Sequence, residues 1–178
     1  MKKKIIIYGA SSLISLELIK LIDQNVSKFF LFCRDKRRVE DFIINNNFDS
    51  KKFSIFEVDI LDIEKNLELV GHIESIDGII WVAGFSGNTD DELKNLDLCE
   101  KNLKINFINP ILIINKILTK MNFDSESFLV AITSVAWLRG RGKNFIYGSA
   151  KAGLISYLSG LRQKYNQRLT VISVIPGY

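Results

Sequence analysis

Residues 4–15 read Lys4-Ile-Ile-Ile-Tyr-Gly-Ala-Ser-Ser-Leu-Ile-Ser15, a short apolar run followed by a glycine and two serines. The apolar run is typical of a parallel strand buried on both faces. Gly9 permits a sharp turn and a close approach of the backbone to a phosphate, and Ser11 and Ser12 can cap a following helix or donate to phosphate oxygens. The stretch predicts a strand, a turn and a helix whose amino end can face an anion. A plain turn with a serine cap would have the same sequence.

The same alternation continues along the rest of the chain. Runs rich in Ile, Val and Phe predict five further buried strands, separated by segments of helical periodicity. This pattern predicts an α/β fold, namely a Rossmann-type doubly wound parallel sheet with helices on both faces. The expected strands are 4–8, 29–33, 53–58, 78–83, 128–133 and 169–175, and the expected helices are 12–24, 36–45, 63–71, 90–120 and 145–165.

The longest of these helical segments contains Asn109-Pro110. Proline removes a backbone donor and disfavours helical geometry in the residue before it. We therefore expect a kink or offset close to Asn106.

Composition and charge exclude several classes of protein. The chain has 178 residues, which fit a single domain with a sizeable core, and a net charge of +4. Its basic residues show no concentrated face with interleaved aromatic residues, so we expect no nucleic-acid partner. The apolar run before Gly9 is too short for a signal peptide or a membrane span.

The cysteine and histidine content also limits the chemistry. Cys33 and Cys99 are far apart in the sequence, and His72 is the single histidine. These counts argue against a disulfide framework and against a metal cluster. We expect a cytoplasmic protein without a membrane partner.

Polar and small residues follow the second, third and fourth expected strands. Arg34 follows the second, where an arginine favours the 2′-phosphate of NADP and a carboxylate would favour NAD. The alternative is that Arg34 simply begins a basic surface cluster. Asp59 follows the third strand, where it could meet an adenine amino group or cap the next helix. Ala83 and Gly84 follow the fourth and would leave room for the middle of a dinucleotide.

Tyr147 and Lys151 are four residues apart in Asn144-Phe-Ile-Tyr-Gly-Ser-Ala-Lys-Ala-Gly153, and Ser134 precedes the tyrosine by thirteen residues. On a helix this spacing places a phenol and an ammonium on one face, one turn apart. The ammonium would favour the phenolate and lower the pKa of Tyr147 from its usual value of about 10. A serine hydroxyl from the end of a neighbouring strand could share the same substrate oxygen, so this group suits proton transfer to a carbonyl.

The sequence resembles the short-chain dehydrogenase/reductase family from its first strand to its last residue. The resemblance rests on motifs that occur in the family's order and spacing: Gly9-Ala-Ser-Ser12, Asp59, Ala83-Gly84, Asn106, Ser134, Tyr147-Gly-Ser-Ala-Lys151 and Pro176-Gly177.

This resemblance implies an NADP-dependent oxidoreductase that reduces a small carbonyl substrate or oxidises the alcohol. Tyr147 would be the proton donor in reduction, Lys151 would also hold the nicotinamide ribose, Ser134 would bind the substrate oxygen, and Asn106 would hold a water in a proton relay. NADP is expected in preference to NAD. The cofactor-binding residues implied are Gly9, Ser11, Ser12, Leu13, Ile14, Arg34, Asp59, Ile60, Ala83, Gly84, Tyr147, Lys151, Pro176 and Gly177.

Residues 139–154 resemble more narrowly the branch near the keto-sugar reductase subunit of decaprenylphosphoryl-ribose epimerase, which implies a keto-sugar substrate. The helices that carry Asn106 and Tyr147 form a dimer interface in the family, so a homodimer or homotetramer is expected. Two glycines in the second helix, Gly148 and Gly153, are expected to allow close approach of the cofactor or of another helix.

The sequence departs from the family's pattern at several positions. Leu13 and Ser15 stand at glycine positions of the turn, where side chains would crowd the pyrophosphate, and Val82 replaces an asparagine that ties neighbouring strands together. The chain ends at Tyr178, so we expect the family's C-terminal substrate segment to be absent. The alternatives are a reductase of acyl-chain or other ketones, and an NAD(P)-binding protein with little or no turnover.

Overall fold

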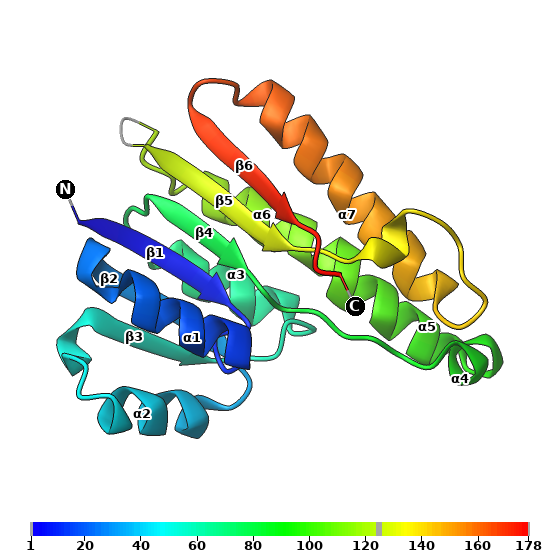
Figure 1. Ribbon diagram of the computed structural model, residues 1–178, viewed down its shortest axis with the longest axis horizontal. Helices are drawn as coiled ribbons and strands as arrows, with labels where there is room; N and C mark the ends of the chain where they lie inside the picture. The colour runs from blue at the N-terminus through cyan, green and yellow to red at the C-terminus, as the bar shows by residue number, and fades with distance from the viewer. Residues whose placement is uncertain (1, 124–125, 178) are drawn as a thin grey trace.

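The computed structural model describes residues 2–123 and 126–177 and is built around a six-stranded sheet (Figure 1). Neighbouring strands are parallel, in the order β3-β2-β1-β4-β5-β6. The predicted Rossmann-type doubly wound sheet is confirmed. The strands are β1 (Lys3–Tyr8), β2 (Val26–Cys33), β3 (Phe53–Glu57), β4 (Gly78–Trp81), β5 (Ser127–Ile132) and β6 (Leu169–Val174).

Helices cover both faces of this sheet, as Figure 1 shows. One face packs on α1 and α2 through a core that includes Ile7, Ile19 and Val39. The other face packs on α3, α6 and α7 through a core that includes Ile79 and Leu154. The helices are α1 (Leu13–Ile22), α2 (Lys36–Asn45), α3 (Ile63–Gly71), α4 (Thr89–Lys94), α5 (Leu96–Leu103), α6 (Asn109–Leu118) and α7 (Phe145–Lys164), with short turns η1 (Asp23–Asn25), η2 (Ser50–Lys52), η3 (Lys104–Ile108) and η4 (Val135–Trp137).

The segment 90–120, predicted as one distorted helix, is divided into four pieces. The expected distortion near Asn106 is confirmed, because η3 is a π-helical turn in which the Asn109 N–H donates to the Lys104 carbonyl. Pro110 has no N–H, so the carbonyl of Asn106 lacks its usual i+4 donor. The prediction of continuous helix before this point was wrong. Asn95 ends α4 in an extended conformation and caps α5 by accepting from the N–H of Asp97.

The strand order reverses direction between β1 and β4, which is where ligands bind in open parallel sheets. β4 ends at Trp81, two residues earlier than predicted, because the N–H groups of Val82 and Ala83 both donate to the Tyr8 carbonyl. This shared acceptor turns the chain away from the sheet, so that residues 82–85 cross the ends of the strands.

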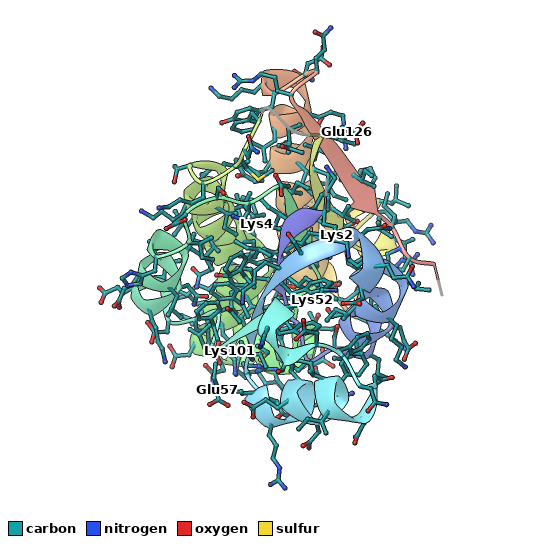
Figure 2. All side chains as sticks on the ribbon, turned by 90° about the vertical axis from the view of Figure 1, so that its left-hand side faces the viewer. Lys2, Lys4, Lys52, Glu57, Lys101 and Glu126 are labelled. Atoms are coloured by element: carbon teal, nitrogen blue, oxygen red, sulfur yellow. The ribbon has the colours of Figure 1, made fainter. Side chains whose placement is uncertain are left out.

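The basic cluster at the N-terminus lies on the opposite side of the molecule from this edge. Figure 2 looks onto the side where the strands begin and shows Lys2 and Lys4 there. Because β1 is a parallel strand that begins at Lys3, these side chains are separated from the carboxyl ends by the length of the strand. Among the described residues, no helix is long and apolar enough to cross a membrane.

Candidate active site

A cavity of about 300 Å³ lies at the carboxyl ends of β1, β2, β3 and β4. Each of these four strands contributes its last residues or the turn that follows it. The lining residues are Tyr8, Gly9, Ser11, Ser12, Phe32, Cys33, Arg34, Arg38, Val58, Asp59, Ile60, Val82, Ala83, Gly84, Phe85 and Ile105.

The turn between β1 and α1 forms one wall of the cavity. Gly9 has φ +82°, and a Cβ there would lie 2.7 Å from the Ala83 nitrogen, so the turn requires glycine. Ser12 caps α1 by accepting from the Ser15 N–H at 3.1 Å. The Ser15 hydroxyl, at a family glycine position, donates to the Gly9 carbonyl at 2.9 Å and is fully buried. The prediction that Ser15 crowds the turn was therefore wrong, because its buried hydroxyl forms a hydrogen bond within the turn and Ser15 does not line the cavity.

Leu13 and Ile14 occupy the first turn of α1, and the structure does not bring their side chains into the cavity. They are 68% and 54% exposed and are not among the lining residues. A bound anion at this position would meet backbone N–H groups at the amino end of the helix. Pro176 and Gly177 follow β6, are exposed, and do not line the cavity either.

Arg34, which follows β2, and Arg38, on α2, both line the cavity. Asp35 does not compete for them, because its carboxylate caps α2 by accepting from the Arg38 N–H at 3.0 Å. Asp59 lies at the end of β3 and accepts from the Leu61 N–H at 2.9 Å. The alternative that Asp59 caps the next helix was wrong, because Asp62 caps α3 by accepting from the Lys65 N–H at 3.1 Å. Asp59 instead holds the turn after β3 and lines the cavity.

The centre of the cavity is shaped by Gly84. A Cβ on Gly84 would lie 3.2 Å from Lys151 Nζ and 3.3 Å from Asn106 Oδ1. The absence of a side chain at Gly84 therefore leaves space beside Lys151 from α7 and Asn106 from η3. Gly84, Lys151 and Asn106 were each expected at the site, and the structure brings them together. Asn106, Ser134, Tyr147 and Lys151 are not lining residues of the cavity.

Ser134, Tyr147 and Lys151 form one cluster beside Gly84. Ser134 follows β5 and caps η4, while Tyr147 and Lys151 share one face of α7, with Nζ 5.6 Å from the centre of the tyrosine ring. Burial raises the pKa of the Tyr147 phenol, and a side-chain hydrogen bond with Ser134 opposes this shift. The expected lowering of the Tyr147 pKa by Lys151 is not found, because burial of the phenol dominates and raises the pKa.

Lys151 is only 3% exposed, and burial lowers its pKa to about 8. An amine with such a pKa can gain or lose a proton close to neutrality. Close packing of α7 holds both groups in place. Cβ atoms on Gly148 and Gly153 would meet the Ala136 carbonyl oxygen at 2.7 Å and the Phe107 ring at 2.6 Å, which confirms that these glycines permit close approach.

Asn106 is held by a buried hydrogen-bond network that the sequence did not reveal. Its Oδ1 accepts from the Phe85 N–H at 3.1 Å, and its Nδ2 donates to the Phe85 carbonyl and to Asn102 Oδ1. Asn102 in turn donates to Glu92 at 2.5 Å, and Glu92 is 3% exposed. A Cβ on Gly87 would overlap the Glu92 carboxylate. These contacts fix the orientation of the Asn106 amide beside the cavity.

The donor groups of the cavity suit the phosphates of a nicotinamide dinucleotide. The amino end of α1 and the two arginines can bind phosphates, and Gly9 and Gly84 leave space for close contact with the backbone. Among the described residues, no group of three His, Cys, Asp or Glu side chains is arranged to hold a metal ion.

Comparison with known proteins identifies the family. The sequence matches the model of the short chain dehydrogenases over residues 3–178, so the chain belongs to that family of oxidoreductases. It is 26% identical over 185 aligned residues to an uncharacterized oxidoreductase of Mycobacterium tuberculosis, a match that covers 99% of this chain and 73% of that protein.

Solved structures share the fold. A short-chain dehydrogenase of Shigella flexneri 2a complexed with NADP superimposes with a TM-score of 0.85 at 22% identity, covering 99% of this chain and 78% of that one. A short-chain dehydrogenase of Burkholderia cenocepacia in complex with NADP has a TM-score of 0.81 at 16% identity, covering 99% and 72%.

Proposed function

We propose that this chain is an NADP-dependent oxidoreductase that reduces a ketone, with Tyr147 as the proton donor. The observation that supports the proposal most directly is the meeting of Ser134, Tyr147 and Lys151 beside Gly84, which lines the cavity. A bound NADPH would supply the hydride to the carbonyl carbon. The protein would then supply position and a proton.

Each residue of the cluster has a defined task in this proposal. Ser134 would donate a hydrogen bond to the substrate oxygen as negative charge develops there. Tyr147, whose raised pKa keeps the phenol protonated near neutrality, would deliver the proton to that oxygen. Lys151 would hold the ribose hydroxyls and replace the proton lost by the phenol. Asn106 would keep a water molecule in line for the relay, because its amide is already oriented by Phe85 and Asn102.

The proposed substrate is a small ketone of the keto-sugar type, on the strength of the resemblance of residues 139–154 to that branch. We also propose self-association through α5, α6 and α7. Its support is the set of exposed apolar side chains on and beside these helices: Leu96 at 82%, Ile108 at 42% and Leu112 at 45% exposure.

The test of this function is a fluorescence titration with NADPH and NADH, followed by a spectroscopic assay of NADPH oxidation with a panel of keto-sugars and simple ketones. Saturable NADPH binding together with turnover of at least one ketone is the expected result. Binding without turnover of any ketone would favour the alternative of a cofactor-binding protein. Absence of binding to either cofactor would reject the proposal.

Arg34→Ala is expected to weaken NADPH binding by roughly 10- to 100-fold and to leave NADH binding almost unchanged, because a charge-assisted contact with the 2′-phosphate is lost. Equilibrium titration of both cofactors measures this. Arg37→Ala is the matched control, since Arg37 belongs to the same basic cluster but its side chain is 91% exposed and lies outside the cavity. Equal losses for NADPH and NADH would show that Arg34 does not recognise the 2′-phosphate.

A further inference from the structure

The turn after β3 is tied to two helices by buried asparagines. Asn66, on α3, is fully buried, and its Nδ2 donates to the Asp59 carbonyl at 2.8 Å and to the Asp62 carbonyl at 2.7 Å. Asn109, at the start of α6, is 4% exposed, and its Nδ2 donates to the Ile60 carbonyl at 2.8 Å. Side chains from two helices therefore hold the backbone of this turn.

The bond from Asn109 connects distant parts of the chain. Asn66 belongs to the helix that follows the turn, so its bonds are local, whereas the bond of Asn109 joins residues 49 positions apart. Asp59 and Ile60 both line the cavity, although Asn109 does not. Asn109 therefore holds a part of the cavity wall in place from outside the cavity.

Asn106 holds another part of the same wall. It lies three residues before Asn109, and both atoms of its amide bond the backbone of Phe85, which follows β4 and lines the cavity. The π-helical turn η3 connects the two asparagines, and such turns frequently occur at functional sites. One distorted stretch of helix thus fixes two separate segments that line the cavity.

The segment that Asn109 holds lies where the adenine half of NADP would bind. Arg34, the proposed partner of the 2′-phosphate, follows β2, and Asp59 and Ile60 follow β3, which is the neighbouring strand. In NADP the adenine base and the 2′-phosphate are attached to the same ribose. A base bound beside Arg34 would therefore meet the turn after β3.

We propose that Asn109 is a positioning residue for the adenine half of the bound dinucleotide. By holding the Ile60 carbonyl, its amide keeps the turn after β3 in the conformation that receives the base. A wall that is ordered before the ligand arrives does not have to be ordered by the ligand, and this raises the affinity. The inference rests on the proposed function, because the cavity must bind NADP(H), but it does not require turnover.

The test is a calorimetric titration of 2′,5′-ADP into Asn109→Leu and into the unaltered protein. Leucine is similar in size but cannot donate, so the Ile60 carbonyl loses its partner. We expect the affinity for 2′,5′-ADP to fall about tenfold. At saturating NADPH, kcat should stay nearly unchanged, because Ser134, Tyr147 and Lys151 are carried by other elements. Asn109→Ala leaves room for a water at the carbonyl, and it should show the same loss of affinity if the leucine variant fails to fold.

Asn115→Leu is the matched control on the same helix. Asn115 is exposed and lies outside the cavity, and its Oδ1 accepts from the Tyr157 hydroxyl at 2.8 Å, so the affinity for 2′,5′-ADP should not change. If the Asn109 variants bound 2′,5′-ADP as tightly as the unaltered protein, the inference would be overturned, even if their melting temperature fell. A loss of kcat as large as the loss of affinity would also overturn it, since that would indicate a general distortion of the site.

The same titrations distinguish this inference from the proposed function. If the unaltered protein bound NADPH but turned over no ketone, the proposed reduction would fall, and the affinity of the Asn109 variants for 2′,5′-ADP would alone decide the inference. If the unaltered protein bound neither 2′,5′-ADP nor NADPH, the proposed function would fall, and the role of Asn109 with it.

Discussion

Tyr147→Phe is expected to lower kcat for ketone reduction about a thousandfold while leaving the Kd for NADPH nearly unchanged. The substitution removes only the phenolic oxygen, which is the proposed proton donor. The ring remains to pack in the half-buried position beside Lys151. Stopped-flow or steady-state assays of NADPH oxidation would measure the loss of turnover, and fluorescence titration would measure binding.

Tyr157→Phe provides a control on the same helix. Both tyrosines are partly buried on α7, and burial raises the pKa of both phenols. The Tyr157 hydroxyl is bonded to Asn115 on α6, so its removal should leave kcat unaltered. A Tyr147→Phe variant that retained turnover within a few-fold of the unaltered protein would remove Tyr147 from the mechanism. Ser134 and Lys151 would then need a different proton source.

The fold could be predicted from the sequence because the central strands β1 and β4 are buried on both faces and the other strands keep the same apolar runs. Short continuous apolar runs such as residues 5–8 are typical of buried parallel strands. The positions of all six strands were predicted within a few residues. The break at Asn95 was missed for a local reason. A single asparagine that caps a helix with its own side chain leaves the surrounding helical periodicity almost intact. The periodicity therefore predicted one continuous helix across Asn95.

The site was predicted in part, and the pattern of success has a physical explanation. Residues recognised by their chemical type at the ends of strands, such as Arg34 and Asp59, lie in the cavity. Leu13 and Ile14 were placed there by the family resemblance, and their side chains are exposed on the first turn of α1, outside the cavity lining. Tyr8 and Glu92 were not found, because burial of a polar group depends on which elements pack over it. A phenol at the end of a buried apolar strand was the one signal that could have indicated Tyr8.

Burial explains the protonation states of Tyr147 and Lys151. It holds the Tyr147 phenol protonated and brings the pKa of Lys151 down to about 8. The usual order of the two pKa values is therefore reversed, and the amine is now the weaker base of the pair. After the phenol has donated its proton, Lys151 can return a proton to the phenolate near neutral pH. An exposed lysine with a pKa near 10.4 would release its proton poorly at that pH.

Lys151→Met is expected to reduce kcat/KM by roughly 100- to 10,000-fold, because the variant can neither relay a proton nor hold the ribose. The same substitution should stabilise the unliganded protein near pH 7. Lys151 is 3% exposed and forms no ion pair with the described residues, so its charge is desolvated without compensation. The shift of its pKa from 10.5 to about 8 corresponds to at most about 3 kcal/mol of unfolding free energy.

The pH dependence of this stabilisation separates the charge from the packing. Below pH 8 the lysine is protonated in the folded and unfolded states, and the full cost of burying the charge is present. Between pH 8 and pH 10.5 the folded protein releases the proton while the unfolded chain retains it, so the unaltered protein gains stability as the pH rises. The advantage of Lys151→Met in urea unfolding should therefore be largest near pH 7 and decline through this window. An advantage that stayed constant from pH 7 to pH 10 would show that the methionine acts through packing alone, and that Lys151 is not a desolvated, titrating amine.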